Sequence, residues 1–490
     1  MKWLWNGAGG MNKRRSIPEI YTYEEGEMAM LLRYFYDEKL AHASYLVGCE
    51  RTGQAVIIDP MRHIAPYVEA AKKKGMKIVG AVESHIHADF VTGTRELAHL
   101  GAAVYLSDEG GKRWAYRHLE ELDHILLKDG DRFTIGSLIF EVLHTPGHTP
   151  ESLSFLLTDS GQADEPIGIF TGDFVLFGGI GRPDILEKSG GVTAEEGAKA
   201  LYRSIKRFKQ LEDYLQVWPA HGAGSSCGKS GGDVPASTVG YEKRFNWALQ
   251  YDEEAAFIQA LLAEQPEVPA YFALMKSINQ NGPKLIGNLP HPELITNTAN
   301  IESLAETDHQ IIDTRDAKSF SEGHLQGTVN IPFNESFPHW IGWIMDYDIP
   351  LYLLADPFEM DDIMITLRSI GIDELAGYLD VQKVLEETSE LDAYMNVTPE
   401  QAKGIMDTED VILLDVRGQN EYGEGHIEGA VNIMVGILKE QLQELPDKKL
   451  IVHCQAGKRS AIAVSILKAN GFHNLVNLEG GYEKWQEDIE

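Results

Sequence analysis

Apolar positions in the first half of the chain form short runs that end in polar turns. Residues 77–84 predict a strand, and further apolar runs lie at residues 167–171 and 217–220. Gly or Pro residues lie at the end of the last two runs, and these residues are typical of tight turns. Polar side chains on such turns are held rigidly, so they are candidates for a functional site.

The second half alternates short apolar runs with helical stretches. Residues 411–414 and 450–452 predict buried strands, and residues 460–470 predict a helix. This alternation is typical of βαβ units with a parallel sheet. Before these units, residues 251–264 predict an amphipathic helix that Pro266 interrupts.

A long motif occurs twice in this second half. Residues 313–332 return as residues 415–434 with the shared pattern D-x-R…G-H-[IL]-x-G-[AT]-x-N-I. Such self-similarity indicates a duplicated module. The pattern resembles rhodanese domains, which are α/β modules with a central parallel sheet. His324 and His426 recur inside the motif, and we expect both to be turn residues that serve the fold.

Six polar residues of the first half have the spacing of one metal site. Each stands at the end of a predicted strand or in a turn that contains Gly or Pro. For one such histidine, an ordinary turn role is as probable as a ligand role, but the full set favours a shared site. The six residues are His85, His87, Asp89, His148, Asp173 and His221.

This set resembles the H-x-H-x-D-H, Gly-His, Gly-Asp and final His signature of the metallo-β-lactamase superfamily. That resemblance implies a four-layered αββα sandwich with the metal at one edge. Phe90 replaces the last His of the first motif, so a second metal would lose a ligand. His85, His148 and Asp173 remain, and two histidines with one carboxylate are typical of non-heme Fe(II) oxygenases.

The region is also similar to persulfide dioxygenases of that superfamily. This resemblance implies one Fe(II) per chain, with Zn as the alternative, held by His85, His148 and Asp173. It places His87, Asp89 and His221 near the metal. Gly181-Arg-Pro-Asp184 resembles a Gly-Arg-x-Asp segment of these enzymes, which implies that Arg182 holds the substrate and Asp184 fixes Arg182. A forked, permanently charged guanidinium suits an anionic sulfur substrate, although a surface ion pair is the alternative.

The chain has three cysteines, and two of them stand in candidate functional loops. Cys227 lies in a Gly-rich loop after His221, where it is either a redox-sensitive or substrate-gating thiol or an inert one. Cys454 lies between a predicted strand and helix, where backbone N–H groups, Lys458 and Arg459 favour the thiolate. The loop resembles the rhodanese active site, which implies that Cys454 carries sulfane sulfur and that Lys458 and Arg459 bind substrate. Cysteine-based phosphatases have a similar loop, and a buried, unreactive Cys454 is the remaining alternative.

The first copy of the module differs at the matching loop. Residues 354–362 contain no cysteine and carry four carboxylates, which would repel anionic sulfur compounds. We expect this copy to be catalytically inactive and to serve as a spacer or docking module. The acidic residues are Asp356, Glu359, Asp361 and Asp362.

Length and charge agree with this organisation. A chain of 490 residues suggests about three domains. Its 43 basic and 75 acidic residues give a net charge of −32, which argues against nucleic-acid binding. Three distant cysteines make a disulfide framework improbable, and no apolar run is long enough to span a membrane. We therefore expect a cytoplasmic protein without membrane partners and, further, a homo-oligomer.

The resulting fold class is α/β, with four expected segments. They are an N-terminal extension at 1–29, a metallo-β-lactamase sandwich at 30–285, an inactive rhodanese-like domain at 286–390 and an active one at 391–490. We call the last two the first repeat and the second repeat.

The expected function is oxidation of a thiol persulfide, carried by glutathione, coenzyme A or a similar thiol, with O2 to sulfite. Rhodanese transfer of sulfane sulfur to sulfite then gives thiosulfate, a sulfide-detoxifying pair of reactions. Two alternatives remain, a dinuclear zinc thiolester hydrolase of the glyoxalase II type fused to a sulfurtransferase, and a non-enzymatic sulfur carrier or sensor.

Overall fold

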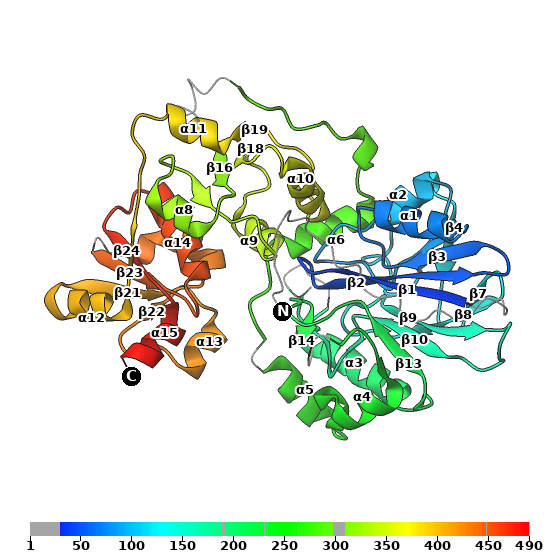
Figure 1. The fold of residues 1–490 in the computed structure, drawn as a ribbon. Coiled ribbons are helices and arrows are strands. Elements are labelled where there is room, and N and C mark those ends of the chain that lie inside the picture. The colour runs from blue at the N-terminus through cyan, green and yellow to red at the C-terminus, as the bar shows by residue number, and fades with distance from the viewer. Residues whose placement is uncertain are drawn as a thin grey trace, which may run out of the picture.

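The computed structural model describes residues 30–185, 187, 192–229, 232, 234–263, 265–296, 309–446 and 448–489. The predicted N-terminal extension, residues 1–29, lies outside the described residues. A two-sheet sandwich at the right of Figure 1 is followed along the chain by two smaller sheets, one at the top and one at the left. No helix in the described ranges is long and apolar enough to cross a membrane.

The first sheet of the sandwich follows the order of the chain. Its first three strands pair antiparallel and the remaining neighbours pair parallel. The strands are β1 (Met30–Asp37), β2 (His42–Cys49), β3 (Gln54–Ile58), β4 (Lys77–Val82), β5 (Ala103–Ser107) and β6 (His124–Leu127).

The second sheet has the order β15-β13-β10-β9-β8-β7, and within it only β10 and β13 pair parallel. Its strands are β7 (Arg132–Ile135), β8 (Leu138–His144), β9 (Leu153–Asp159), β10 (Gly168–Gly172), β13 (Gln216–Pro219) and β15 (Ser237–Thr238). A small additional sheet contains β11 (Val175–Leu176), β12 (Gly179–Gly181) and β14 (Gly228–Lys229).

Apolar side chains from both sheets meet in a buried core that includes Val47, Val56, Phe140 and Phe155. Helices α1 (Ala65–Lys73) and α2 (Thr94–His99) lie along the first sheet. The outer face of the second sheet packs against three helices, in a core with Ile169 and Val217. These helices are α3 (Ala194–Phe208), α4 (Val239–Phe245) and α5 (Glu254–Leu262). The predicted αββα sandwich is therefore confirmed.

Both repeats contain a sheet in which every strand pairing is parallel, as the alternating pattern predicts. The first repeat contains β16 (Gln310–Asp313), β17 (Val329–Asn330), β18 (Leu351–Ala355) and β19 (Gly377–Asp380), with α8 (Ala317–Glu322), α9 (Phe337–Ile344), α10 (Met360–Ser369) and α11 (Val381–Glu387). The second contains β20 (Met395–Val397), β21 (Val411–Asp415), β22 (Val431–Asn432), β23 (Lys449–His453) and β24 (Leu475–Leu478), with α12 (Pro399–Thr408), α13 (Gln419–Glu424), α14 (Lys458–Ala469) and α15 (Gly481–Asp488).

The duplicated motif has the same structural role in both repeats. Arg315 donates hydrogen bonds to Asp313 and to the Gly323 carbonyl. Arg417 makes the matching bonds to Asp415 and to the Gly425 carbonyl. The motif histidines also match, because each ring bonds to the carbonyl four residues earlier and stacks on that residue's aromatic ring. These contacts hold the segments that follow β16 and β21, in agreement with a fold role for His324 and His426.

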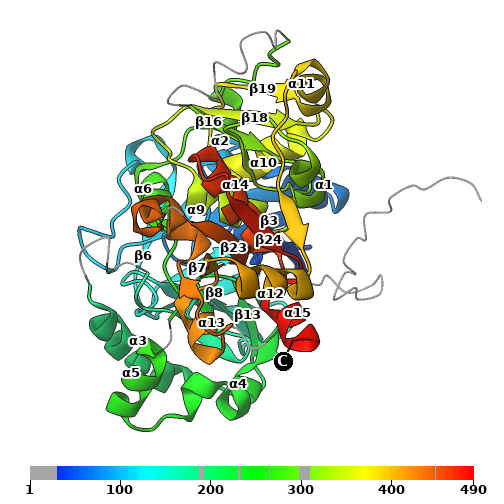
Figure 2. The ribbon, with the colours of Figure 1, turned by 90° about the vertical axis from the view of Figure 1, so that its left-hand side faces the viewer.

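Helix α6 (Phe272–Asn281) joins the sandwich to the first repeat. Phe272 and Met275 share one buried core with Ile341 and Leu367 of the first repeat. Figure 1 shows α6 beside α9 and α10, and Figure 2 shows the second repeat in front of the sandwich after a quarter turn. The first repeat is therefore packed against the sandwich through an apolar interface.

Candidate metal centre and sulfur-transfer loop

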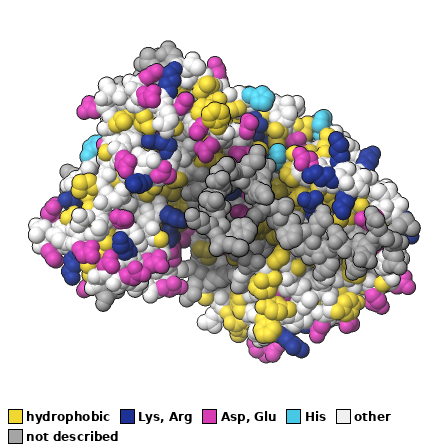
Figure 3. All heavy atoms as spheres, in the orientation of Figure 1, with side chains coloured by type: hydrophobic (Ala, Val, Ile, Leu, Met, Phe, Trp, Pro, Cys, Tyr) yellow, Lys and Arg dark blue, Asp and Glu magenta, His cyan; other side chains and the backbone are white. Residues whose placement is uncertain are grey.

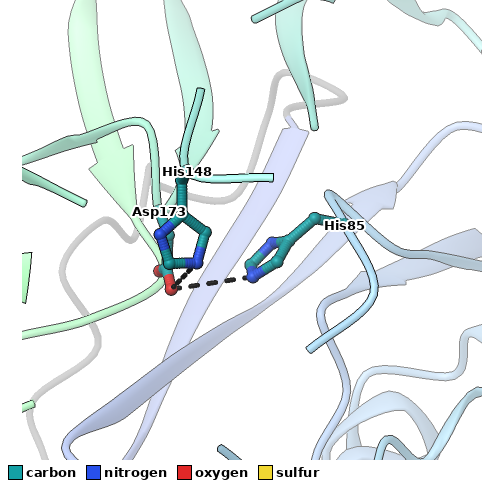
Figure 4. Close-up of side chains that lie close together, drawn as sticks. All are labelled: His85, His148 and Asp173. Carbon is teal, nitrogen blue, oxygen red and sulfur yellow. Dashed lines mark ion pairs between the residues drawn. The ribbon is translucent and has the colours of Figure 1, made fainter. Parts of the chain in front are cut away.

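Three side chains from different loops of the sandwich converge on one point. His85 follows β4, His148 lies between β8 and β9, and Asp173 directly follows β10. Asp173 Oδ2 lies 3.6 Å from His85 Nε2 and 3.4 Å from His148 Nε2, and all three side chains are buried (Figure 4). The structure therefore brings together the three residues expected to bind the metal.

The donor atoms of this group fit a bound cation. Within the described part of the chain, His85 Nε2 and Asp173 Oδ2 are buried without a hydrogen-bond partner, although such atoms are normally paired. An ion about 2.0–2.2 Å from each ligand would separate neighbouring donors by roughly 3.0–3.5 Å, close to the spacing found. Burial lowers the pKa of both histidines, so their imidazoles stay neutral and can donate a lone pair.

Neighbouring groups orient both ligand rings. His148 Nδ1 donates to the carbonyl of Arg182 over 2.9 Å, which leaves the lone pair of His148 on Nε2. His85 Nδ1 is hydrogen-bonded to Ser84 Oγ at 2.9 Å. Gly181 permits this close packing, since a Cβ at that position would lie 2.1 Å from the carbonyl oxygen of Asp173. The ligand geometry is thus fixed by residues around it.

His221 lies between two carboxylates at the side of this group. Its Nδ1 is 2.6 Å from Asp173 Oδ1 and its Nε2 is 2.8 Å from Asp89 Oδ2. Burial alone would lower the pKa of His221, but the charges of Asp173 and Asp89 outweigh burial and raise the pKa well above its ordinary value. Burial alone would raise the pKa of Asp173. The charge of His221 and its hydrogen bond to Asp173 outweigh the effect of burial and hold that pKa well below its usual range. In this arrangement both ring nitrogens of His221 are engaged.

Phe90 fills the place expected for a further histidine. Its ring is fully buried. The centroid of this ring lies 4.2 Å from the centroid of the His42 ring and 4.5 Å from that of the His87 ring. A phenyl ring offers no lone pair to a metal. Asp89, His221 and Cys227 form a second group of potential ligands, whose donor atoms lie within 4.8 Å of one another.

Two residues near these rings escaped the sequence analysis. His42 donates from Nε2 to the carbonyl of Asp59. Asp59 Oδ1 accepts from Ser84 N at 2.7 Å and lies 3.2 Å from His87 Nε2. Asp59 directly follows the apolar strand β3, as Asp173 follows β10, and that shared pattern is the signal that could have identified it.

Two further residues that the sequence analysis missed hold the loop of His85 and Asp89. Glu151 Oε1 accepts from Ile86 N at 2.8 Å, and burial raises the pKa of Glu151 to about 7. Asn279 of α6 donates to the carbonyls of His87 and Phe90 and accepts from Thr92 N. These contacts pass through the backbone, so residue type alone gives little indication of them.

Arg182 and Asp184 form the pair expected from the resemblance. Arg182 Nε and Nη2 donate to the two carboxylate oxygens of Asp184 at 2.8 and 2.6 Å, and Nη2 also donates to the Pro266 carbonyl. The Arg182 side chain is buried, and its Nη1 has no hydrogen-bond partner among the residues that the structure describes. This group therefore has donor capacity left for an anion.

Cys227 lies close to the metal group, but its surroundings favour the thiol form. Burial raises the pKa of Cys227 most, and the negative charges of Asp89 and Asp173 raise it further, to well above its ordinary value. Lys229, the basic residue two positions later in this loop, has a side chain that lies outside the described part of the chain. The redox or gating role of Cys227 stays a prediction.

Cys454 stands between β23 and α14, as the sequence predicts. The helix begins at Lys458, and its N-cap Gly457 has φ +85°, a conformation that suits glycine. Arg459 contacts Cys454 and is held by Glu421 through two bonds of 2.5 and 2.6 Å. Both predicted cations lie in the first turn of α14: Arg459 contacts the buried Cys454, and Lys458 is exposed to solvent.

The matching loop of the first repeat presents carboxylates to solvent. Asp356, Glu359, Asp361 and Asp362 are all exposed, and the last two lie in the first turn of α10. An anion at this helix N-terminus would meet negative side chains instead of Lys458 and Arg459. The loop is therefore unsuited to anionic sulfur compounds.

Comparisons with known proteins agree with this architecture. The metallo-beta-lactamase superfamily model matches residues 38–221, and the rhodanese-like domain model matches residues 398–488. Persulfide dioxygenase ETHE1, mitochondrial, of Homo sapiens is 34% identical over 197 residues, a match that covers 39% of this chain and 68% of that protein. Hydroxyacylglutathione hydrolase of Gloeobacter violaceus is 31% identical over 179 residues, which are 36% of this chain and 62% of that protein.

A crystal structure of a metallo-beta-lactamase from Staphylococcus aureus subsp. aureus COL is similar over a longer stretch. It is 43% identical with a TM-score of 0.66, and it covers 72% of this chain and 99% of its own. The similarity to ETHE1 covers more than two thirds of that protein at over 30% identity. The chain therefore belongs to the family of the ETHE1 persulfide dioxygenases within the metallo-β-lactamase superfamily, and it carries a C-terminal rhodanese-like domain.

Proposed function

We propose that the chain is a persulfide dioxygenase with one Fe(II), joined to a sulfurtransferase. The observation that carries this proposal is the complete group of His85, His148 and Asp173, combined with Phe90 in place of a further histidine. The two neutral imidazoles and the carboxylate would hold an iron ion, which would supply redox and Lewis-acid chemistry for a persulfide and dioxygen.

The residues around this group prepare it for that reaction. The Nη1 group of Arg182 is the buried donor available to an anionic sulfur substrate, and Asp184 keeps its guanidinium in place. Burial of all three ligands keeps water from competing with the substrate. The overall reaction consumes a persulfide R–S–SH, O2 and water and yields the thiol R–SH and sulfite.

Cys454 would carry out the second reaction. Its thiolate attacks the outer sulfur of another persulfide, so the S–S bond breaks and the thiol R–SH leaves after taking up a proton. Sulfite then attacks the sulfur carried by Cys454, which gives thiosulfate and restores the thiolate. Arg459 beside Cys454, together with the N-terminus of α14, would stabilise the anions. Both sites on one chain raise the local sulfite concentration at Cys454.

A dinuclear zinc thiolester hydrolase is the second candidate. Asp89, His221 and Cys227 lie close enough to act as a second ligand group, and hydroxyacylglutathione hydrolase is among the relatives. Against it, Phe90 removes one ligand and both nitrogens of His221 are engaged by carboxylates. A sulfur carrier or sensor without catalysis is a third candidate, and it would show no multiple turnover.

Cys454→Ser separates the two reactions. The variant should consume oxygen and release sulfite from glutathione persulfide at the wild-type rate, while thiosulfate formation should fall by at least about a thousandfold, because the covalent carrier is lost. Cys49→Ser is the matched control, since Cys49 is a buried thiol that bonds to Ser137 in the sandwich, away from the metal group. Loss of sulfite formation in Cys454→Ser would contradict the assignment of roles.

A further inference from the structure

Helix α6 contacts the loop that begins with the first metal ligand. This loop, residues 85–92, follows β4, and we call it the metal loop. Asn279 of α6 donates from its amide to the carbonyls of His87 and Phe90 at 2.8 and 2.7 Å. Its Oδ1 accepts from Thr92 N at 3.0 Å. All three bonds are buried, so one side chain fixes the path of most of the metal loop.

A second contact reaches the start of the metal loop through Glu151. This buried carboxylate accepts from the backbone N–H of Ile86, next to His85 in the chain, at 2.8 Å. The ammonium of Lys276, on α6, interacts electrostatically with the carboxylate and lies 3.5 Å from the centre of the Trp114 ring. Helix α6 therefore acts on the metal loop at both ends.

The same helix is packed tightly against the first repeat (Figure 1). Met275 is fully buried, and a Cβ at Gly371 of the first repeat would lie 2.6 Å from its Cε. Gly342 of α9 lies as closely against Tyr271, the residue before α6, because a Cβ there would lie 2.8 Å from the Tyr271 ring. Contacts this close leave little room for α6 to move independently of the first repeat.

The end of α10 contacts the sandwich directly. Val91 N, within the metal loop, donates to the carbonyl of Ser369 at 2.7 Å. The ammonium of Lys39 donates to Thr366 Oγ1 at 3.0 Å. Both acceptors lie in the last turn of α10. The first repeat therefore touches the metal loop itself as well as α6.

We propose that the first repeat is a working part of the metal centre, because through α6 and the end of α10 it holds the metal loop in the shape that binds the ion. Asn279 is then a positioning residue, which acts on the metal through the backbone of the loop. A repeat without a cysteine thereby has a function. Since the metal loop contacts both the ion and the first repeat, metal binding and docking of the first repeat stabilise each other. The role of Asn279 rests on the metal centre of the proposed function, whichever ion fills it.

Titration of the metal-free full chain with Co(II) under argon tests the role of Asn279. The visible absorption of Co(II) reports the ligand geometry, and competition with a chelator gives the affinity. Asn279→Asp keeps the shape of the side chain but removes both N–H donors, so the carbonyls of His87 and Phe90 lose this partner. The variant should bind Co(II) about 10- to 100-fold more weakly, the usual cost of losing a group that orients metal ligands, and with a changed absorption spectrum.

Asn281→Asp is the matched control for this titration. Asn281 is exposed on the same helix and donates to Ser277, so its replacement should leave the Co(II) affinity and spectrum unchanged. A role of Asn279 limited to fold stability gives a different result, namely a lower urea midpoint with the affinity and spectrum of the wild type. That result would overturn the proposal.

Gly342→Ala tests the first repeat at a distance from the metal loop, and it decides the matter if Asn279→Asp does not fold. The added methyl group presses on the Tyr271 ring and displaces α9 from the start of α6. The Co(II) affinity should fall by about fivefold or more, as for coupled sites. Gly404→Ala on α12 is the control, because a Cβ there meets no atom of the described residues within 4 Å. An affinity of Gly342→Ala equal to that of Gly404→Ala would contradict the proposal.

Hydrogen exchange of the wild type provides the reciprocal measurement. Loading the full chain with Co(II) should slow exchange in peptides of α6 and α10, because an ion that fixes the metal loop also strengthens its contacts with these helices. Peptides of α12 are the internal control and should exchange at the same rate. Equal exchange of α6 and α10 with and without the ion would overturn the proposal. The proposed function fails by a different result, namely that the iron-loaded wild type consumes no oxygen with any persulfide, and the Co(II) titrations then still report on Asn279.

Discussion

Phe90 limits the metal centre to a single ion in our account. Its ring lies against the rings of His42 and His87. Asp89, His221 and Cys227 form the second group of potential metal ligands. Phe90→His would place an imidazole there in a slightly smaller side chain. We expect the variant to bind two metal ions per chain after reconstitution with zinc, measured by elemental analysis.

Phe90→Leu is the control for that experiment, because it changes the volume without adding a ligand. It should keep the stoichiometry of the wild type. A Phe90→His protein that still binds a single ion would show that Phe90 is not what excludes the second metal.

The principal site residues could be predicted from their spacing, whereas their supports could not. His85, Asp173 and Cys454 each follow the end of a strand closely, and His148 lies in a turn directly after Gly147. The structure brings the three expected metal ligands together. Glu151 and Asn279 act on the backbone of the metal loop from distant segments. Such contacts depend on the tertiary fold, so local sequence carries no signal of them.

At the scale of elements, Arg62 joins the sandwich to the first repeat. Its guanidinium is buried and donates to Asp373, to the Arg368 carbonyl and to the Lys284 carbonyl. Asp373→Ala leaves this buried charge without the acidic partner that the described residues give it, so the free energy of unfolding should fall by about 3 kcal/mol, measured by urea denaturation.

The neighbouring residue provides the comparison for Asp373→Ala. Glu374 pairs with Lys284 on the surface, with both side chains more than half exposed. Glu374→Ala should therefore cost less than about 1 kcal/mol. Equal effects of the two substitutions would mean that the Arg62 contacts do not hold the two parts together.

Strand β23 carries a buried histidine that makes the second repeat sensitive to acid. Burial lowers the pKa of His453 to about 4, and the charge of Asp415 only partly opposes this. The unfolded chain, with an ordinary pKa near 6.5, binds the extra proton first, so stability is lost as the pH falls from about 6.5 toward 4. The loss would approach about 3 kcal/mol at pH 4.

Hydrogen exchange of β23 peptides in urea at pH 6.5 and 4.5 would measure this effect. His453→Leu removes the titrating group, so its stability should change less between the two pH values than that of the wild type. An identical change in both proteins would assign the acid sensitivity to other residues.

Element types were predictable from periodicity, but their ends were not. The strand expected at 77–84 ends at Val82, because Ser84 N bonds to the side chain of Asp59 instead of a neighbouring strand. The helix expected at 251–264 ends at Leu262, before Pro266. The helix expected at 460–470 begins two residues earlier, at Lys458, where Gly457 provides the left-handed N-cap.

At the scale of the whole molecule, α9 connects the parts that carry chemistry. Its first turns line a cavity of about 340 Å³ that Asp89 also lines, and Trp343 lies against Gly436 of the second repeat. Figure 3 shows many Asp and Glu side chains over this face of the molecule, in keeping with the net charge of −32. Anionic substrates must therefore rely on local cations such as Lys39, Arg182 and Arg459.

The expected three-part organisation could be predicted from the duplicated module and the metal-site motifs. The packing of the first repeat on the sandwich could not be predicted from the sequence. Its contacts involve Arg62, Lys39 and α6, and none of these stands out by residue type or spacing. The sequence alone identifies the first repeat as lacking a catalytic cysteine, and the structure adds that it lies against the metal loop.

Elemental analysis coupled to oxygen consumption on the purified wild-type chain tests the central claim most directly. We predict one iron per chain, and oxygen uptake with glutathione persulfide that matches the sulfite formed when Cys454 is replaced by Ser. Two zinc ions per chain, with thiolester hydrolysis and no oxygen uptake, would contradict it.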